Sequence, residues 1–384
     1  MKKAVMYGAG NIGRGFIGKV FSDSGYKVCF IDIDKKLIDA FNKDKEYYVK
    51  IVADDFERLE KVKNVYAVDA NSDQAVQEIA ECDIMATSVG VNALPYIVDN
   101  IAKGIRMRMS MGSKPLDIIL AENLIDVDAR MRQMIYEKLN PEEQKWAEQH
   151  LGLVEASIGR MVPPLTEEER EKSPLLIAVE PYSELPVDSL GFKGPIPDLV
   201  GLKPFTPFDF YIKRKLFLHN MGHAICAYLG WEKQYQYISE AIRDQVIYNK
   251  TKSAMELIVQ ALAKEYPQIP VKEIEANKDD LLYRFHNRAL KDTIERVAKD
   301  PIRKLQPNDR LVGAARYCLD SGIRPDEIVE GIAAALKYDN PNDPAAVKIQ
   351  DDISKFGMDY VLENVLKLDR GSELWDMLKS KLEG

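Results

Sequence analysis

One short stretch of the chain combines side chains that can hold or move a proton. On an α-helix, with about 100° per residue, its four polar residues fall at about 0°, 40°, 140° and 80°, so they share one side. A solvated polar face is the usual explanation for such a stripe on a helix. The chemical interpretation is the oxidation of an alcohol, which needs a base for the hydroxyl proton and a donor for the developing alkoxide. In chain order the residues are Lys215, His219, Asn220 and His223.

Lys215 is the candidate base of this set. An exposed lysine is protonated at neutral pH, so a useful base needs a lowered pKa. Burial would lower it, and so would cationic neighbours such as Lys213 and Arg214. We expect Asn220 to polarise the carbonyl or alkoxide oxygen, and His223 to hydrogen-bond the substrate or to orient the lysine.

Zinc is the alternative means of activating an alcohol. The chain has only four histidines and no cysteine cluster near them. Two histidines at i, i+4 without an acid at ligand spacing are weak evidence for a metal site. The sequence therefore predicts chemistry without a metal ion.

A glycine-rich turn near the amino end is the second informative pattern. It follows a strand-like run and opens a helix, which is the context in which GxGxxG binds a dinucleotide, although packing alone can also require such a turn. Gly8 would make the tight turn, Gly10 would let the backbone approach a pyrophosphate, and Gly13 would allow close packing. The free N–H groups of the helix start would hold the phosphates. We assign cofactor binding to Gly8, Ala9, Gly10, Asn11, Ile12 and Gly13.

Asp32 ends the next strand, roughly 20 residues past the glycines, where an acid binds the adenosine ribose. Its carboxylate can accept hydrogen bonds from both ribose hydroxyls and would repel a 2′-phosphate, so the sequence predicts NAD rather than NADP. Asp34 is a nearby competitor, and either acid can instead be a strand-end turn residue.

Strand-like and helix-like segments alternate through the first half of the chain. This alternation predicts an α/β fold, with a mostly parallel sheet covered by helices on both faces. We expect residues 1–200 to form a Rossmann-like, NAD-binding domain. The predicted strands are 3–7, 27–32, 64–68, 83–88 and 117–121, and the predicted helices are 16–23, 75–80 and 95–103.

Six prolines between Pro181 and Pro207 make long regular elements improbable there and place the domain boundary near residue 200. Beyond it, apolar residues recur at helical spacing. Residues 201–384 are therefore predicted to form a mainly α-helical substrate and catalytic domain. The helical segments are 208–229, 240–265, 272–284, 292–298, 309–321, 326–337 and 344–382.

The composition narrows the class of protein. Lys and Arg number 53 against 61 Asp and Glu, a net charge of −8, which disfavours nucleic acid and anionic membranes as partners. The four cysteines are spread without a CxxC pair, and no apolar run is long enough for a signal peptide or a membrane span. We expect a soluble cytoplasmic protein with reduced thiols.

Several motifs together resemble the zinc-independent, polyol-specific long-chain dehydrogenases of the mannitol dehydrogenase superfamily, and among them the branch that acts on mannitol 1-phosphate. The most specific is the family's K-x4-N-x2-H pattern, met by Lys215, Asn220 and His223. The resemblance implies that the lysine is the general acid and base, and that Asn220 shares an oxyanion hole with Asn123. It also places Thr87 at the cofactor. The matching segments are GAGNIGRGFIG at 8–18, AENL at 121–124, RKLF and HNMGHA within 214–224, PIRKLQPNDRL at 301–311 and EGIAAAL at 330–336.

The chain also departs from the family pattern. Ala121 stands where the family has cysteine before Glu-Asn, Val91 ends a motif that ends in proline elsewhere, and Ile158 stands for valine in the Val-Asp-Arg-Ile-Val-Pro motif. Gly159 replaces an aspartate, and Arg288 stands where proline usually follows Asn287. These last two changes bear on the substrate rather than on the chemistry.

The expected activity is NAD-dependent interconversion of a hexitol phosphate and a ketohexose phosphate, foremost D-mannitol 1-phosphate and D-fructose 6-phosphate. Arg303 and Lys304 are candidate contacts for the sugar phosphate, since arginine suits phosphate oxygens; solvated charges at a helix start are the alternative. An unphosphorylated polyol or a hexuronate is the second interpretation. A non-catalytic, NAD-binding regulator is the third. The sequence leaves the oligomeric state and the direction of flux open.

Overall fold

The computed structural model describes residues 1–112 and 114–383. They divide into two compact units, Met1–Asp209 and Phe210–Gly384. The prolines place the boundary near residue 200. The first unit continues to Asp209 because β11 (Leu202–Phe205) pairs with β10 (Leu185–Asp188).

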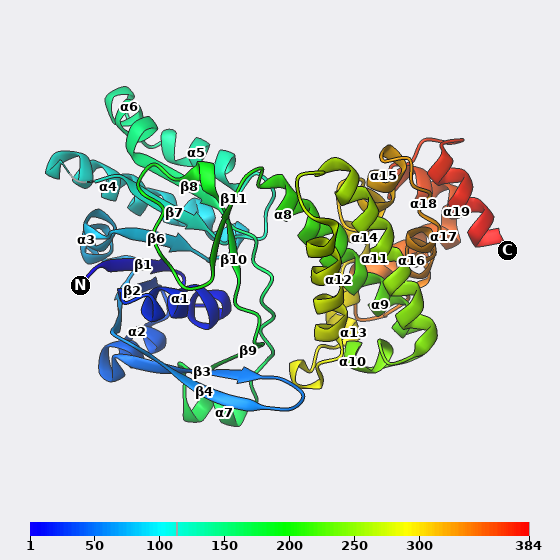
Figure 1. The fold of residues 1–384 in the computed structure, drawn as a ribbon, viewed down its shortest axis with the longest axis horizontal. Helices are drawn as coiled ribbons and strands as arrows, with labels where there is room; N and C mark the ends of the chain where they lie inside the picture. Colours follow the sequence, from blue (N-terminus) through cyan, green and yellow to red (C-terminus); the bar gives the residue numbers. More distant parts are fainter. Residues whose placement is uncertain (113, 384) are drawn as a thin grey trace. The chain divides into compact units, whose positions relative to one another are not determined.

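The first unit is built on a six-stranded sheet in which every neighbouring pair of strands is parallel (Figure 1). Its order is β5-β2-β1-β6-β7-β8. Numbered within this sheet alone, that is 3-2-1-4-5-6, the order of dinucleotide-binding sheets, which confirms the predicted Rossmann-like fold. The strands are β1 (Lys3–Tyr7), β2 (Lys27–Asp32), β5 (Val65–Asp69), β6 (Ile84–Thr87), β7 (Leu116–Leu120) and β8 (Leu151–Glu155).

Helices cover both faces of this sheet, and alternate residues of β1 feed two separate cores. Ala4 and Met6 pack on the side of α1 and α2, whereas Val5 and Tyr7 pack on the side of α3, α4 and α5. Burial on both faces holds the central strands in register. The helical elements are η1 (Gly13–Ile17), α1 (Gly18–Asp23), α2 (Lys35–Asp44), α3 (Asp73–Glu81), η2 (Val91–Ala93), α4 (Leu94–Met111), α5 (Val127–Tyr136), α6 (Pro141–His150), α7 (Glu167–Lys172) and η3 (Ser189–Gly191).

Two smaller sheets were not foreseen from the sequence. Strands β3 (Glu46–Val52) and β4 (Glu57–Lys63) form an antiparallel hairpin, and β9 (Ile177–Val179) pairs with β3 in parallel. The other small sheet is the β10–β11 pair. Its strands have four residues each, as expected for a proline-rich segment.

The second unit is mainly helical, which confirms the predicted fold class (Figure 1). Its central helix α9 (Met221–Glu232) is buried along most of its length, and Gly222 lets Met255 of α11 approach its backbone. Helix α8 begins at Asp209, the last residue of the first unit, and leads into this unit. The other elements are α8 (Asp209–Lys213), η4 (Arg214–Asn220), α10 (Ile238–Ala241), α11 (Gln245–Glu265), α12 (Val271–Phe285), η5 (Arg288–Leu290), α13 (Ile294–Ala298), α14 (Pro301–Lys304), α15 (Val312–Asp320), α16 (Asp326–Lys337), α17 (Pro344–Phe356), α18 (Met358–Asn364) and α19 (Glu373–Glu383).

The expectation of a helical segment running unbroken over 344–382 is wrong. Gly357 has φ +84°, a left-handed conformation that ends α17, and residues 365–372 separate α18 from α19. The segment 240–265 is also divided, because Asp244 accepts hydrogen bonds from two N–H groups and starts α11 there. Apolar spacing alone does not show such breaks.

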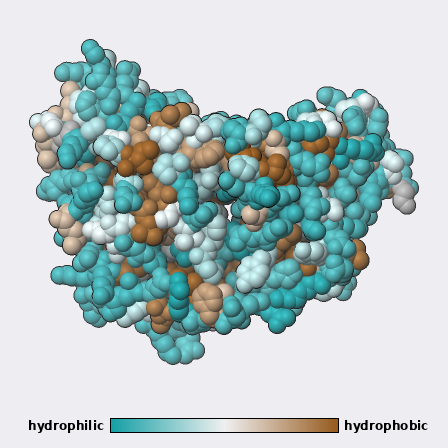
Figure 2. All heavy atoms as spheres, viewed as in Figure 1, coloured by the Kyte–Doolittle hydropathy of each residue, from teal (hydrophilic) through white to brown (hydrophobic). Residues whose placement is uncertain are grey.

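No helix among the residues described has both the length and the apolar character to cross a membrane. On the face drawn in Figure 2, hydrophilic residues predominate and hydrophobic ones lie in separate patches. All four cysteines are buried and unpaired with one another, as expected for thiols that pack as small hydrophobes.

Candidate active site

The glycine turn connects β1 to the helix that follows it. Gly8 has φ +97°, and a side chain there would overlap the carbonyl oxygen of Ser88. A Cβ at Gly13 would overlap the carbonyl oxygen of Gly8, so the helix can approach the turn only without one. At Gly10 a Cβ would meet no atom of the protein within 4 Å. Gly8 and Gly13 therefore serve packing, and Gly10 keeps the turn open to a ligand.

The helix after the turn begins with backbone N–H groups that have no preceding helical turn to bond to. Its first helical hydrogen bond runs from the N–H of Arg14 to the carbonyl of Gly10, at 3.0 Å. The N–H groups of Asn11, Ile12 and Gly13 precede it, so they fall among the helix-start donors that lack a helical partner. Such a start binds anions, and a pyrophosphate fits it.

Asp32 holds this turn from the neighbouring strand. Its Oδ2 accepts the N–H of Ala9 at 2.6 Å, and its Oδ1 accepts the N–H groups of Ile33 and Asp34 at 2.7 and 3.0 Å. A carboxylate has about four acceptor positions, so about one remains for a ribose hydroxyl. Asp34 instead caps α2 by accepting from the N–H groups of Lys36 and Leu37.

A cleft of about 860 Å³ opens beside these residues, within the size range of small-molecule sites. Ile33 and Tyr96 line it with side chains that are 73% and 83% exposed. Asn100 on α4 donates to the hydroxyl of Tyr7 at 3.0 Å and to the carbonyl of Ala70 at 2.7 Å, and so ties the wall to the sheet. The cleft lies at the carboxyl ends of the strands, beside the neighbouring pair β1 and β6 at which the strand order reverses, which is the ligand position in open α/β sheets.

Thr87 is placed differently from the other predicted cofactor residues. It is the last residue of β6 and is fully buried, and it does not line the cleft, although Ser88 and Val89 do. Its hydroxyl lacks a hydrogen-bond partner in the part of the chain that the structure describes. Asn123 follows the next strand, β7, and is exposed.

In the helical unit, Lys215 lies on η4 and has the lowered pKa that a base needs. Burial, together with the smaller effect of the positive charge of Arg310, lowers its pKa to about 8. The expectation that Lys213 and Arg214 supply this charge is wrong. Lys213 pairs with Glu265 at 2.5 Å, and Arg214 stacks on the ring of Tyr211 at 4.4 Å.

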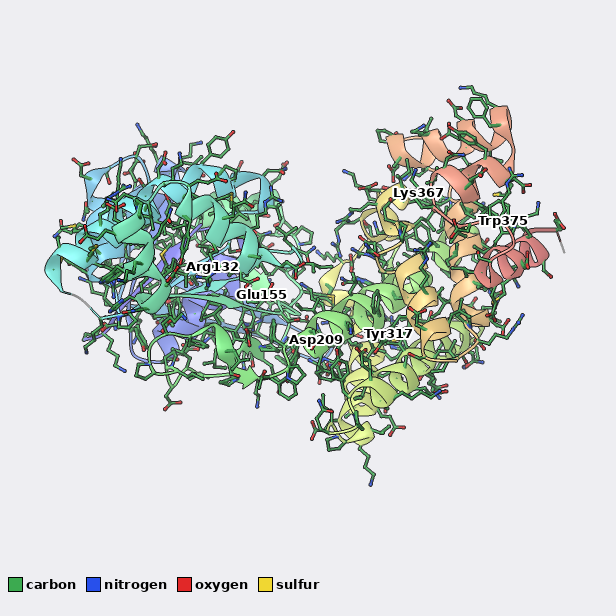
Figure 3. The ribbon with its side chains drawn as sticks, turned by 90° about the horizontal axis from the view of Figure 1, so that it is seen from above. Arg132, Glu155, Asp209, Tyr317, Lys367 and Trp375 are labelled. Atoms are coloured by element: carbon green, nitrogen blue, oxygen red, sulfur yellow. The ribbon has the colours of Figure 1, made fainter. Side chains whose placement is uncertain are left out.

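The helix geometry also differs from the one assumed. Residues Arg214–Asn220 form a π-helical segment, so the positions calculated for a regular α-helix do not hold. Phe217 of this segment stacks on Tyr317 of α15, labelled in Figure 3, with ring centroids 5.3 Å apart. Tyr317 donates to Glu265 at 2.6 Å, so the same carboxylate binds both Tyr317 and Lys213. Such π segments are rare and frequently mark functional sites.

His223 is held between an aromatic ring and an acid. Its ring stacks on Phe285 at 4.8 Å, and its Nε2 lies 3.0 Å from Oδ2 of Asp292. The two atoms are within ion-pair distance, although the direction of the contact does not meet hydrogen-bond geometry. Asp292 also binds Arg296 at 2.5 Å. Burial acts to raise the pKa of Asp292, but His223 and Arg296 outweigh it, so the pKa is lowered.

The neighbouring polar residues differ in burial. His219 is buried, and burial together with the charge of Arg284 holds its pKa well below the usual value, so its ring is neutral. Asn220, one residue further along, is partly exposed at the end of the π segment. Lys215 is also partly exposed over the residue as a whole, whereas its amine is desolvated by burial.

The two candidate phosphate contacts are separated by the fold. Arg303 is about half exposed and pairs with Asp300 at 3.4 Å. Lys304 is buried and donates to the carbonyl of Lys299, and burial and the charge of Arg310 lower its pKa to about 7. Of the pair, only Arg303 has a side chain that faces solvent.

Two acids that the sequence did not single out contact a predicted residue or the loop that follows one, Thr87. Asp292 holds His223, and Glu122 accepts hydrogen bonds from the N–H groups of Val89 and Gly90. Glu122 directly precedes Asn123, and that adjacency was the available signal. Asp292 lies far from His223 in sequence and offered none.

Residues 1–112 and 114–383 contain no group of three or more His, Cys, Asp or Glu side chains arranged to hold a metal ion.

Arg160, in one of the motifs that depart from the family pattern, is buried and donates to the carbonyls of Glu180 and Gly15. Gly159 beside it faces Tyr182, whose ring would lie 3.2 Å from an added Cβ. Arg288, the other departure, is exposed on η5.

The chain matches two family models in succession. The mannitol dehydrogenase Rossmann domain matches residues 2–201, and the mannitol dehydrogenase C-terminal domain matches residues 208–378. These two ranges cover most of the chain.

Solved structures show the same fold. A D-sorbitol dehydrogenase in substrate-free form is 16% identical with a TM-score of 0.81, covering 100% of this chain and 93% of that one. The Pseudomonas fluorescens mannitol 2-dehydrogenase, in a ternary complex with NAD and D-mannitol, is 17% identical with a TM-score of 0.72, covering 100% and 91%. With both domains matched in order, the chain belongs to the mannitol dehydrogenase family of NAD-dependent polyol dehydrogenases.

Proposed function

We propose that the protein is an NAD-dependent, metal-independent polyol dehydrogenase in which Lys215 carries the proton. The observation that carries this proposal is the buried amine of Lys215, whose pKa is lowered to about 8. An amine with that pKa is partly neutral at neutral pH, so it can accept a proton in one direction and donate it in the other. Asn220 and His223 stand five and eight residues further along the same helical run.

The cofactor proposed for the first unit is NAD. When bound, it accepts the hydride from the carbinol carbon and returns it in the reverse reaction. We assign its pyrophosphate to the N–H groups of Asn11, Ile12 and Gly13 and its adenosine ribose to Asp32. Gly8 and Ala9 shape the turn, Gly10 leaves room for the ligand, and Thr87 ends the strand beside it. The negative charge of Asp32 disfavours the 2′-phosphate of NADP.

In alcohol oxidation, the neutral amine of Lys215 takes the proton of the hydroxyl group as the hydride leaves the carbon that bears this hydroxyl. In ketose reduction, the protonated amine returns that proton to the oxygen. We propose that the amides of Asn220 and Asn123 donate to this oxygen, where negative charge develops. His223, held by Asp292, binds a neighbouring hydroxyl or orients the lysine.

The finer proposal is that the substrate is a sugar phosphate, with D-mannitol 1-phosphate and D-fructose 6-phosphate as the pair. Arg303 supports this proposal, because it is exposed and has the geometry that suits phosphate oxygens. The burial of Lys304 favours the second candidate, an unphosphorylated polyol, because a phosphate would then meet only one of the two predicted cations.

One substrate panel tests both proposals. The purified protein and NADH are mixed with D-fructose 6-phosphate, with D-fructose and with a hexuronate, and the loss of NADH absorbance is followed. We expect turnover with the phosphate ester and a much lower kcat/KM without the phosphate. Equal values with and without it would overturn the phosphate proposal, and no turnover with any sugar would overturn the polyol dehydrogenase proposal.

Arg303→Ala sharpens the same panel. We expect a higher KM for D-fructose 6-phosphate and little change for unphosphorylated sugars. Arg324→Ala is the matched control, because Arg324 is also an exposed arginine of this unit that pairs with a nearby aspartate, Asp326, at 2.9 Å. An equal rise in KM in both variants would show that the effect is one of general charge.

A further inference from the structure

The backbone ladder between β6 and β7 ends at the edge of the sheet that faces the cleft. Its last hydrogen bond runs from the N–H of Ala121 to the carbonyl of Thr87, at 3.0 Å. Beyond this point a side chain takes over. Glu122 accepts the N–H of Val89 on Oε1 at 3.0 Å and the N–H of Gly90 on Oε2 at 2.9 Å.

The setting of Glu122 makes these bonds strong. Only 5% of the residue is exposed, so its carboxylate has lost most of its water and depends on these donors. Gly90 has φ +85°, a conformation that few other residues adopt, so the loop is held in a specific shape. Val89 and its neighbour Ser88 line the cleft.

Asp32 makes a corresponding contact with the loop after β1. It ends β2, which flanks β1, and holds the N–H of Ala9 in the loop after β1. Glu122 follows β7, which flanks β6, and holds the loop after β6. Each of the two central strands therefore ends in a loop that is fixed by an acid from the strand beside it.

We propose that Glu122 is a positioning residue of the cofactor site, and that it fixes the loop 88–90 in the shape that NAD binds. Asn123 is the next residue, so the contacts of Glu122 also help to position the side-chain amide of Asn123 after β7. The proposal rests on the proposed function for its ligand, but the contacts that carry it belong to this chain alone.

The chain offers a matched control in Asp117. This acid is also buried, lies on β7, and accepts two backbone N–H groups, from Lys193 at 2.7 Å and from Gly194 at 3.1 Å. It stands near the start of the strand, whereas Glu122 follows the end. Asp117→Asn and Glu122→Gln therefore remove equivalent bonds at opposite edges of the sheet.

Amide hydrogen exchange and NADH fluorescence test the proposal without turnover. In Glu122→Gln, the side-chain NH₂ replaces one of the two accepting oxygens and faces a backbone N–H, so one of the two hydrogen bonds to the loop is lost. We therefore expect at least about tenfold faster amide exchange over residues 88–90 and about tenfold weaker NADH binding. Asp117→Asn should lower the melting temperature about as much as Glu122→Gln does, but it should leave both the exchange over residues 88–90 and NADH binding unchanged. Unchanged NADH affinity in Glu122→Gln, or an equal loss in both variants, would overturn the positioning role.

Gly90→Ala tests the same loop if Glu122→Gln does not fold. An added Cβ meets no atom within 4 Å, but the positive φ disfavours alanine, so the loop shifts while the carboxylate stays. We expect weaker NADH binding here too, and full affinity would contradict the proposal. If the wild-type protein itself does not bind NADH, the proposed function fails first, whereas wild-type binding with an unaffected variant removes Glu122 alone.

Discussion

The two units prepare their candidate chemistry in different ways. In the sheet unit, the ligand-facing groups are mostly backbone N–H donors, and acids such as Asp32 and Glu122 fix the loops that present them. In the helical unit, the reactive groups are side chains whose charge is costly in their surroundings, as the pKa values of Lys215 and His219 show. A binding surface of backbone groups depends on shape, whereas a proton carrier depends on electrostatics.

The largest expected effect is the loss of the proton carrier. Lys215→Ala should lower kcat by at least roughly 10²–10⁴-fold, the usual cost of a lost general acid or base, with NADH binding little changed. Lys213→Ala is the control, since Lys213 is paired with Glu265 and should be dispensable for turnover. A non-catalytic regulator does not need this amine and would keep its function in both variants. Near-wild-type function in Lys215→Ala would therefore contradict the assignment of Lys215 as the proton carrier of an enzyme.

The glycine turn should show the opposite behaviour, with shape rather than charge decisive. Gly10→Ala meets no protein atom, so the melting temperature should change by no more than about 2 °C, while NADH binding weakens by about tenfold or more. Gly13→Ala meets the carbonyl of Gly8, and overpacking of about 1–3 kcal/mol should lower the melting temperature by several degrees. Calorimetry and fluorescence titration of both variants separate the two roles.

A smaller effect is expected behind the reactive groups. Asp292→Asn keeps the size of the side chain but removes the charge beside His223, so kcat/KM should fall by about tenfold, the value of one charge-assisted contact. NADH binding should not change. Asp359→Asn, at a half-exposed acid that pairs with Lys379, is the control. An unchanged kcat/KM in Asp292→Asn would show that His223 needs no such partner.

The smallest effect concerns Arg310, the cation whose charge acts on Lys215. Arg310→Met removes a positive charge that favours the neutral amine, so the pKa of Lys215 should rise towards its ordinary value. Burial is the larger cause of the lowering, so the rise should be no more than about one pH unit. The pH at which the oxidation rate is half-maximal measures it, and a downward shift would contradict the assignment of Arg310.

The sequence predicted the sheet unit better than the helical unit, for a physical reason. Strand, turn and acid in the glycine motif lie within about 30 residues, so local spacing defined the Gly8 turn and Asp32. The partners of Lys215 and His223 are Arg310 and Asp292, which come from distant segments, and no local pattern announces them. Apolar periodicity likewise missed the π turn at Arg214–Asn220, because it assumes one rotation per residue. Lys304 was taken as available because spacing does not reveal burial.

The pH dependence of turnover in both directions tests the central claim most directly. Because the neutral amine of Lys215 is the base, kcat/KM for polyol oxidation should rise with pH through one ionisation near the pKa of about 8 and then level off. Ketose reduction needs the protonated amine, so it should fall as pH rises through a related ionisation. The residual activity of Lys215→Ala should lack both. If that variant kept the wild-type ionisation, the proton carrier would be another group, and His223 would be the next to test.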